Sequence, residues 1–198
     1  MVAARERVLR EAVAEEQRAA EMGNPVVAPS NVPRMPNIND PQFESEERPP
    51  GFRARRARIG YELGSELIGC SLWEVPPGET AYPYHFHYAD EEVLIVLAGR
   101  PALRTPEGER PLEPGEAVRF PLGESGAHQV INRTDETVRF LAISSHGRPD
   151  VVVYPDAGKV GVGERLPRGG GLRAFFRQGD AVGYWEGEAP SSRDERRQ

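Results

Sequence analysis

Between residues 52 and 145 the sequence is a succession of short apolar runs, each interrupted by glycine, proline or another residue that favours turns. Such runs, with no helical repeat between them, are typical of short β-strands. We expect strands over residues 56–62, 67–75, 81–87, 92–98, 101–105, 117–121, 127–132 and 137–144. The chain has 19 prolines and 21 glycines among 198 residues, which suits many tight turns better than a helical bundle. The pattern therefore predicts an all-β sandwich or barrel.

The segments on either side of this region differ from it in composition. Residues 2–22 carry arginine and glutamate at helical spacing and predict a helix, whereas the many prolines of residues 24–50 predict an extended arm. We expect the arm to lie on the surface or on a partner subunit. The predicted organisation is a helix and proline-rich arm at 1–51, a barrel at 52–146, an extension that packs on the barrel at 147–188, and a disordered tail at 189–198.

The predicted extension has two features that suggest folded structure. Residues 151–154 form an apolar run that predicts one more strand, at an edge of the sheet. Four large aromatic residues follow, which are Phe175, Phe176, Tyr184 and Trp185. Because aromatic side chains of this size are unfavourable in water, we expect them to fold back onto the barrel.

Charge and hydropathy exclude several classes of partner. The formal net charge is -6, which speaks against general affinity for nucleic acid or anionic membranes. The longest aliphatic run, residues 93–98, is too short to cross a bilayer, so we expect a cytoplasmic protein without membrane contact. The chain has one cysteine, Cys70, so an intrachain disulfide is impossible and we expect a buried, unreactive thiol.

Two of the four histidines lie in the sequence His85-Phe86-His87. Side chains alternate between the faces of a strand, so His85 and His87 share one face and can reach one metal ion. Glu92 opens the next predicted strand, and His128 lies in a later one. The alternative interpretation is that these histidines are ordinary hydrogen-bonded residues of the barrel core.

The spacing of these residues resembles the two motifs of the cupin superfamily. The first motif corresponds to Gly78, His85, His87, Glu92 and Gly99, and the second to Gly115, Pro121, Gly123, His128 and Asn132. Six residues separate Gly78 from His85 and four separate Gly123 from His128, one and two more than is usual in the family. The stretch from Pro83 to Glu92 is similar to single-domain bacterial cupins of unassigned function, which have a cupin type 2 conserved barrel.

This resemblance implies a double-stranded β-helix, or jelly-roll barrel, with one divalent metal ion bound by His85, His87, Glu92 and His128. Three imidazoles and one carboxylate suit Mn, Fe, Co, Ni, Cu or Zn, whereas Mg and Ca prefer shells made of oxygen alone. In a six-coordinate ion, two positions would remain for water or a substrate. The sequence does not select one of these metals.

The resemblance leaves two classes of function open. Cupins include dioxygenases, decarboxylases and sugar isomerases, and we favour a dioxygenase acting on a small organic acid or aromatic compound. The alternative is a non-catalytic module that uses the metal to bind a carboxylate or a sugar. The sequence identifies no catalytic residue, because no second carboxylate or histidine has a clear inward position on the ligand strands. With one predicted helix and a negative charge, binding to nucleic acid is not expected.

Three further groups of residues have weaker implications. Tyr82, Tyr84, Phe86 and Tyr88 have the parity opposite to the ligands, which predicts an exposed aromatic stripe and favours a homodimer. The arginines at 53, 55, 56 and 58 could bind a phosphate but more often form a solvated strand face. His146 is expected in a surface loop, and the sequence does not decide whether Trp73 or Glu74 faces inward.

Overall fold

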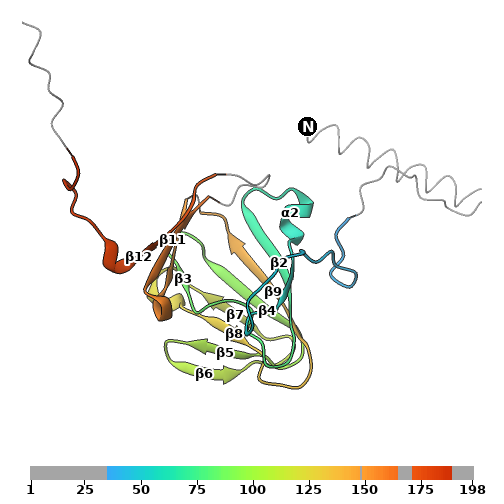
Figure 1. The fold of residues 1–198 in the computed structure, drawn as a ribbon. Helices are drawn as coiled ribbons and strands as arrows, with labels where there is room; N and C mark the ends of the chain where they lie inside the picture. The colour runs from blue at the N-terminus through green and yellow to red at the C-terminus, as the bar shows by residue number, and fades with distance from the viewer. Residues whose placement is uncertain (1–34, 148, 165–170, 189–198) are drawn as a thin grey trace, which may run out of the picture. The chain divides into compact units, whose positions relative to one another are not determined.

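The structure is a computed structural model, and it describes residues 35–147, 149–164 and 171–188. Most regular elements within these ranges are β-strands, which confirms the all-β prediction (Figure 1). The predicted helix at 2–22 and the predicted tail at 189–198 lie outside the described residues. The strands belong to a compact unit that begins at Asn37. No helix in the described part of the chain is long and apolar enough to cross a membrane.

The larger sheet is antiparallel and has five strands in the order β1, β2, β9, β4, β7. The bounds of its strands are Arg55–Ala57 for β1, Ile68–Val75 for β2, Val138–Ser145 for β9, Glu92–Ala98 for β4 and Ala117–Phe120 for β7. In the registers of β2 and β4 against β9, Phe140 lies opposite both Trp73 and Val96. Directly opposed side chains share a face, so these three residues line one side of the sheet.

Two smaller antiparallel sheets face the larger one. The first contains β6 (Gly108–Pro111), β5 (Ala102–Thr105) and β8 (Gln129–Ile131), and the second contains β12 (Arg173–Arg177), β11 (Lys159–Gly163), β10 (Asp150–Tyr154) and β3 (Phe86–His87). Bridges from Thr80 to Ile131 and from His85 to His128 join the two sheets through the segment that leads into β3. Together these sheets form the second layer of the fold.

The main core lies between the two layers. Trp73, Val75 and Phe140 of the larger sheet pack in one cluster with Leu103 and Val130 of the three-stranded sheet. Leu94 and Val96 of β4 are each only 1 % exposed and belong to this cluster, which fixes the inward face of β4 as the face that also carries Glu92. The burial of Leu94 and Val96 therefore determines that Glu92, the first residue of β4, points inward.

The outer face of the larger sheet is covered by the arm and by a short helix. Ile38 and Phe43 pack with Leu72 and Leu141, and Glu44 N donates to Arg56 O at 2.9 Å. The described part of the predicted arm therefore lies along the chain's own sheet.

The prediction of a strand over residues 56–62 is wrong for the C-terminal part of that range. The strand β1 stops at Ala57, and a helix, α2, follows at Ile59–Leu63. Gly64 ends this helix in the left-handed conformation, with φ 71°. The buried Ile59 packs with Ala57 and Leu72, so tertiary packing selects a helical turn in a segment whose residues favour a strand.

Other elements also differ from the sequence-based expectation. Residues 81–84 are bent, His85 forms a single bridge with His128, and only Phe86–His87 of the predicted strand 81–87 forms a strand. The strand β10 pairs with both β3 and β11, so it is an interior strand and not the edge strand that we expected. Three short one-turn helices, η1 (Glu124–Gly126), η2 (Pro155–Ala157) and η3 (Gln178–Asp180), complete the described elements.

The aromatic residues of the extension are not buried on the barrel as expected. Phe175 and Phe176 belong to β12, which pairs with β11, yet their side chains are about half exposed. Tyr184 and Trp185 are 86 % and 77 % exposed and contact each other edge to face. The extension is thus joined to the second layer by strand pairing.

Candidate metal centre

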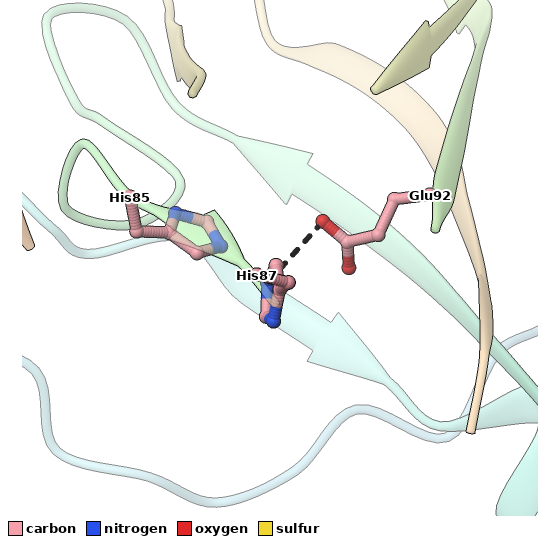
Figure 2. A group of neighbouring side chains, drawn as sticks. All are labelled: His85, His87 and Glu92. Atoms are coloured by element: carbon pink, nitrogen blue, oxygen red, sulfur yellow. Dashed lines mark ion pairs between the residues drawn. The ribbon is translucent and has the colours of Figure 1, made fainter. Parts of the chain in front are cut away.

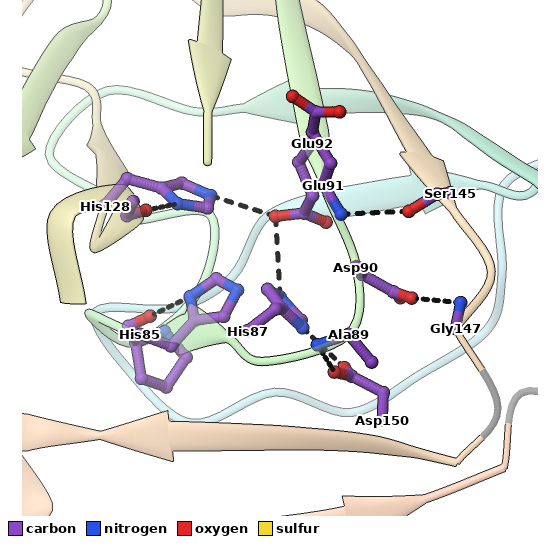
Figure 3. Close-up of polar contacts among 12 residues, drawn as sticks. His85, His87, Ala89, Asp90, Glu91, Glu92, His128, Ser145, Gly147 and Asp150 are labelled. Atoms are coloured by element: carbon purple, nitrogen blue, oxygen red, sulfur yellow. Dashed lines mark hydrogen bonds and ion pairs between the residues drawn. The ribbon is translucent and has the colours of Figure 1, made fainter. Parts of the chain in front are cut away.

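The four residues that the motif spacing selects lie together (Figure 3), and Figure 2 shows three of them, His85, His87 and Glu92. His87 ends β3 and His85 directly precedes that strand, while Glu92 opens β4 and His128 directly precedes β8. One ligand atom from each of His85, His87 and Glu92 lies within 4.8 Å of the others. The Glu92 Oε2 atom is 3.4 Å from His87 Nε2 and 3.3 Å from His128 Nε2.

All three imidazoles are oriented through their Nδ1 atoms. Each Nδ1 lies within hydrogen-bonding distance of an oxygen: Pro83 O at 2.8 Å for His85, Gly126 O at 2.9 Å for His128, and Asp150 Oδ2 at 2.6 Å for His87. Carbonyl and carboxylate oxygens only accept, so in a neutral imidazole the hydrogen is on Nδ1. Nε2 is then the nitrogen whose lone pair can bind a metal.

This donor set fits a transition-metal ion. Two donors about 2.1 Å from a common ion, at angles of roughly 90–110°, lie about 3.0–3.4 Å apart. The separations of 3.3 and 3.4 Å between Glu92 Oε2 and the two imidazole nitrogens match that geometry. A cation is attracted by both the carboxylate and the nitrogen lone pairs, which repel one another when they meet alone.

The environment of His128 favours its neutral form. Its side chain is almost fully buried, and this burial lowers the pKa of His128 from its ordinary value of 6.5, although the negative charge of Glu92 acts in the opposite direction. The ring of Phe120 stacks on the imidazole, with centroids 3.7 Å apart and planes 5° apart. The imidazole is therefore held in one plane in the protonation state that binds metals.

Comparison with known proteins agrees with this architecture. The family model for the cupin domain matches residues 71–144, which include all four candidate ligands. Residues 71–144 therefore form a domain of the cupin superfamily. No curated protein sequence matches it.

Two solved structures illustrate what this cupin is similar to. A candidate sugar phosphate isomerase from Acidithiobacillus ferrooxidans is 27 % identical, with a TM-score of 0.62, and the match covers 71 % of this chain and 86 % of that one. A sugar phosphate isomerase of the cupin superfamily from Silicibacter pomeroyi is 24 % identical, with a TM-score of 0.64, over 75 % of this chain and 95 % of that one. The second likeness establishes the fold alone.

The two unusual loop lengths of this cupin both contribute to the site. The residues between Gly123 and His128 form η1, and its Gly126 carbonyl orients the His128 ring. A side chain at position 126 would lie 1.8 Å from Pro121 O, so the turn requires glycine there. The longer loop thus supports the candidate ligand His128.

The extra residue before His85 accompanies a bend that changes the position of Tyr82. Its ring lies inside, 5.0 Å from that of His85 and 5.6 Å from that of His128, so its predicted place on an outer stripe is wrong. Burial, together with the Glu92 charge, raises the pKa of Tyr82 well above 10. Side chains in a bend do not alternate between two faces as they do in a strand. Counting odd and even positions along the sequence therefore gives the wrong direction for the Tyr82 side chain.

The rest of the predicted aromatic stripe is mostly buried. Tyr84 and Phe86 pack with Val153 in a cluster on the other face of the second layer, and of the four residues only Tyr88, at 56 % exposure, is open to solvent. The stripe therefore no longer supports a homodimer, which stays a prediction.

Asp150 is the main site residue that the sequence analysis missed. It is 1 % exposed, and its two oxygens accept from His87 Nδ1 and from Ala89 N, at 2.6 and 3.2 Å. Asp90, also buried, accepts from Gly147 N at 2.5 Å and lies in one carboxylate and imidazole cluster with Asp150 and His87 (Figure 3). These bonds tie the loop between His87 and Glu92 to the start of the extension.

The remaining candidates lie outside the cluster of four ligands. Glu91 forms an ion pair with Arg119 at the surface, on the opposite side of the strand from Glu92. His146 is half-buried, with Nδ1 3.3 Å from Glu66 O and Nε2 close to Gly69. Trp73 faces inward and Glu74 faces outward, which settles the question that the sequence left open. The arginines at 53, 55, 56 and 58 are each paired with a glutamate.

Cys70 is partly buried on the outer side of the larger sheet. Burial raises the pKa of its thiol, so the unreactive protonated form is favoured.

Proposed function

We propose that this cupin binds one divalent transition-metal ion through His85, His87, Glu92 and His128, and that it holds a small molecule beside the ion. The observation that supports the proposal is the common orientation of the three imidazoles. Each Nδ1 is bonded to an oxygen, and the Nε2 atoms of His87 and His128 both meet the carboxylate of Glu92. Core histidines that only satisfied hydrogen bonds would not need this arrangement.

The neighbouring side chains suit a confined pocket for a small organic molecule. Tyr82, Phe120 and Tyr154 contact the imidazoles with their rings and provide largely apolar walls. When bound, a metal ion in such a site supplies Lewis acidity or a binding position for dioxygen. The aromatic rings limit the access of water to the site, while Glu92 and Asp150 hold the imidazoles in place.

Two reactions are proposed for this site. The first is a dioxygenase reaction on a small organic acid or aromatic compound, which the aromatic walls would accommodate. The second is isomerisation of a phosphorylated sugar, which is favoured by the 27 % identity with the candidate isomerase from Acidithiobacillus ferrooxidans. The non-catalytic alternative is a module that binds a carboxylate or a sugar through the metal.

The metal site is tested by elemental analysis of protein purified without chelator. Wild-type protein is expected to contain about one transition-metal ion per chain, and His85→Ala and His128→Ala are expected to lose most of it. His146→Ala is the matched control, because His146 lies outside the cluster of four ligands, and should retain the metal. Full metal content in both ligand variants would contradict the proposal.

A second measurement separates the proposed activities. Oxygen uptake that depends on an added organic acid or aromatic compound, by protein that contains iron or manganese, would support the dioxygenase. Conversion between an aldose phosphate and its ketose without oxygen uptake would support the isomerase. Bound zinc with neither activity would support the binding module.

A further inference from the structure

The face of the second layer that carries the metal ligands continues across β10, β11 and β12. His87 pairs with Val152, Tyr154 pairs with Lys159, and Lys159 pairs with Arg177. Paired residues share a face, and so do residues two apart on one strand. Tyr154, Lys159 and Arg177 therefore lie on the same face as His87.

Ring contacts place this surface directly beside the candidate metal centre. The Tyr154 ring stacks on the imidazole of His85, with centroids 5.9 Å apart and planes 22° apart. On the same strand face, the Lys159 Nζ atom lies 4.5 Å from the centroid of the Tyr154 ring. One aromatic ring thus separates the ammonium group from a candidate metal ligand.

Three cations gather on this surface, and we call Lys159, Arg173 and Arg177 the cationic face. Phe175 lies between them on β12, with its ring 5.3 Å from Lys159 Nζ and 5.6 Å from the Arg173 guanidinium carbon. Gly161 lies opposite Phe175, and a side chain there would come within 2.9 Å of the ring. Glycine therefore lets the aromatic ring lie close to the sheet beneath the cations.

The cationic face differs from the other basic residues in its lack of carboxylate partners. Within residues 35–147, 149–164 and 171–188, every other arginine lies within 4.0 Å of an aspartate or glutamate oxygen. No such contact to another described residue is made by Lys159, Arg173 or Arg177. Among the residues that the structure describes, the lysine and arginine side chains without a carboxylate partner therefore all lie on the face beside the candidate metal centre.

This arrangement has an energetic cost unless an anion is present. Lys159 and Arg177 are directly opposed in the register of β11 and β12, and like charges in that relation destabilise a sheet. An anion between the two side chains would convert repulsion into two charge-assisted hydrogen bonds. Guanidinium and ammonium groups together match the oxygens of a phosphate.

We infer that the cationic face binds the phosphate group of a small phosphorylated molecule whose oxygen-bearing end reaches the metal centre. The inference rests on the proposed function only for the part of the molecule that reaches the metal ion. The phosphate is held by Lys159 and Arg177, with Arg173 at the rim, and Tyr154 forms the floor between phosphate and metal. Three cations suit a dianionic phosphate better than a single carboxylate.

The inference is tested on full-length, metal-free protein with inorganic phosphate as the probe. Phosphate affinity is measured by calorimetry for wild type and for the double variant Lys159→Gln/Arg177→Gln. The matched control is Arg100→Gln/Arg133→Gln, which removes two exposed arginines that are paired with Glu113 and Glu109. We expect the first variant to bind phosphate at least about tenfold more weakly and the control to stay within about twofold. Acetate should bind wild type more weakly than phosphate does.

Three outcomes would overturn the inference. The first is that wild type does not bind phosphate, and the second is an equal loss of affinity in both double variants, which would show a general effect of net charge. The third is a change from dimer to monomer in sedimentation of the Lys159→Gln/Arg177→Gln variant, which would show that the cations serve a subunit interface. Because the measurements use metal-free protein, they do not depend on the metal proposal. If the protein as purified contained its full complement of metal but the metal-free form did not bind phosphate, the phosphate inference would be refuted and the metal proposal would stand.

Discussion

The Nδ1 atom of His87 lies 2.6 Å from Oδ2 of Asp150, and both side chains are almost fully excluded from solvent. Asp150 belongs to β10, beyond residues 71–144 that match the cupin family model. Its other oxygen accepts from Ala89 N in the loop that leads to Glu92. One carboxylate outside the matched region thus orients a candidate ligand and fixes the loop between two of them. Partners of this kind strengthen and orient metal-binding imidazoles.

The variant Asp150→Asn is expected to weaken metal binding by roughly 10–100-fold. An asparagine has a single carboxamide oxygen, so its NH2 group must face either the His87 imidazole or the Ala89 N–H. If it faces the imidazole, the hydrogen moves from Nδ1 to Nε2, the nitrogen that meets Glu92. Affinity can be measured by competition with a chromophoric chelator.

The matched control for this substitution is Asp156→Asn. Asp156 is exposed and forms an ion pair with Arg104, and it makes none of the contacts with His87 described above. Its removal should leave the metal affinity within about twofold, because exposed ion pairs contribute little. Equal affinity of Asp150→Asn and wild type would show that Asp150 has only a structural role.

Phe140 is expected to be a main determinant of stability. It is 0 % exposed and packs against Trp73 and Tyr82 where the two layers meet. Phe140→Ala should lower the free energy of unfolding by about 3–5 kcal/mol through lost burial and a new cavity. Urea denaturation of metal-free protein measures the change.

The control for this substitution is Leu67→Ala, at a side chain that is 76 % exposed. It should change the free energy of unfolding by no more than about 0.5 kcal/mol. Similar losses of stability in the two variants would contradict the assigned core.

The presence of many short strands and the residue types of the candidate metal ligands could be predicted from the sequence, because both depend on short-range periodicity. Alternation in β4 is regular from Glu92 to Val96, so the motif spacing that selected Glu92 gives a residue on the same face as Leu94 and Val96. The same rule failed at Tyr82, because a bend at residues 81–84 interrupts the alternation. Parity is informative only where the backbone is extended and paired.

The missed features depend on contacts between distant parts of the chain. Asp150 and His87 are 63 residues apart, and no local pattern around Asp150 marks it as a partner of an imidazole. Two of the five residues of β11 are glycines and four of the five residues of β12 are exposed, so neither segment is clearly marked as a strand by its sequence. The cationic face is likewise visible only after the registers of β10, β11 and β12 are known.

The stability of the metal-free protein is expected to fall as the pH decreases below neutrality. Burial lowers the pKa of His128 below 6.5 in the folded state, so the unfolded chain takes up its proton first as the pH falls. The contribution of His128 is fully present above the unfolded pKa and is lost as the pH falls toward the folded one. Urea midpoints of chelator-treated protein between about pH 7.5 and 5.5 should show this decline.

The comparison variant for this pH dependence is His128→Gln, which cannot take up the proton. Its urea midpoint should decline less steeply over the same interval than that of wild type, because one source of proton uptake on unfolding is removed. Equal slopes in the two proteins would mean that other groups account for the decline and that the His128 pKa is not lowered by burial.

The adjacent carboxylates Glu91 and Glu92 should differ sharply in their effect on metal binding. They point to opposite sides of the strand, Glu92 toward His87 and His128 and Glu91 toward Arg119 at the surface. Glu92→Gln keeps the shape of the side chain but removes the negative charge between two imidazoles. We expect it to lose most of the metal, whereas Glu91→Gln keeps it and changes stability by about 0–1 kcal/mol.

Metal content after identical purification is the measurement for both variants. If Glu91→Gln emptied the site and Glu92→Gln did not, the register of β4 would be wrong by one residue. That shift would also turn Leu94 and Val96, each 1 % exposed, out of the core and bring Val93 and Ile95 in. Leu94→Ala and Ile95→Ala therefore provide an independent check, since with the present register the loss of stability should be larger at Leu94. Agreement of the metal and stability measurements would tie the ligand assignment to the packing of the barrel core.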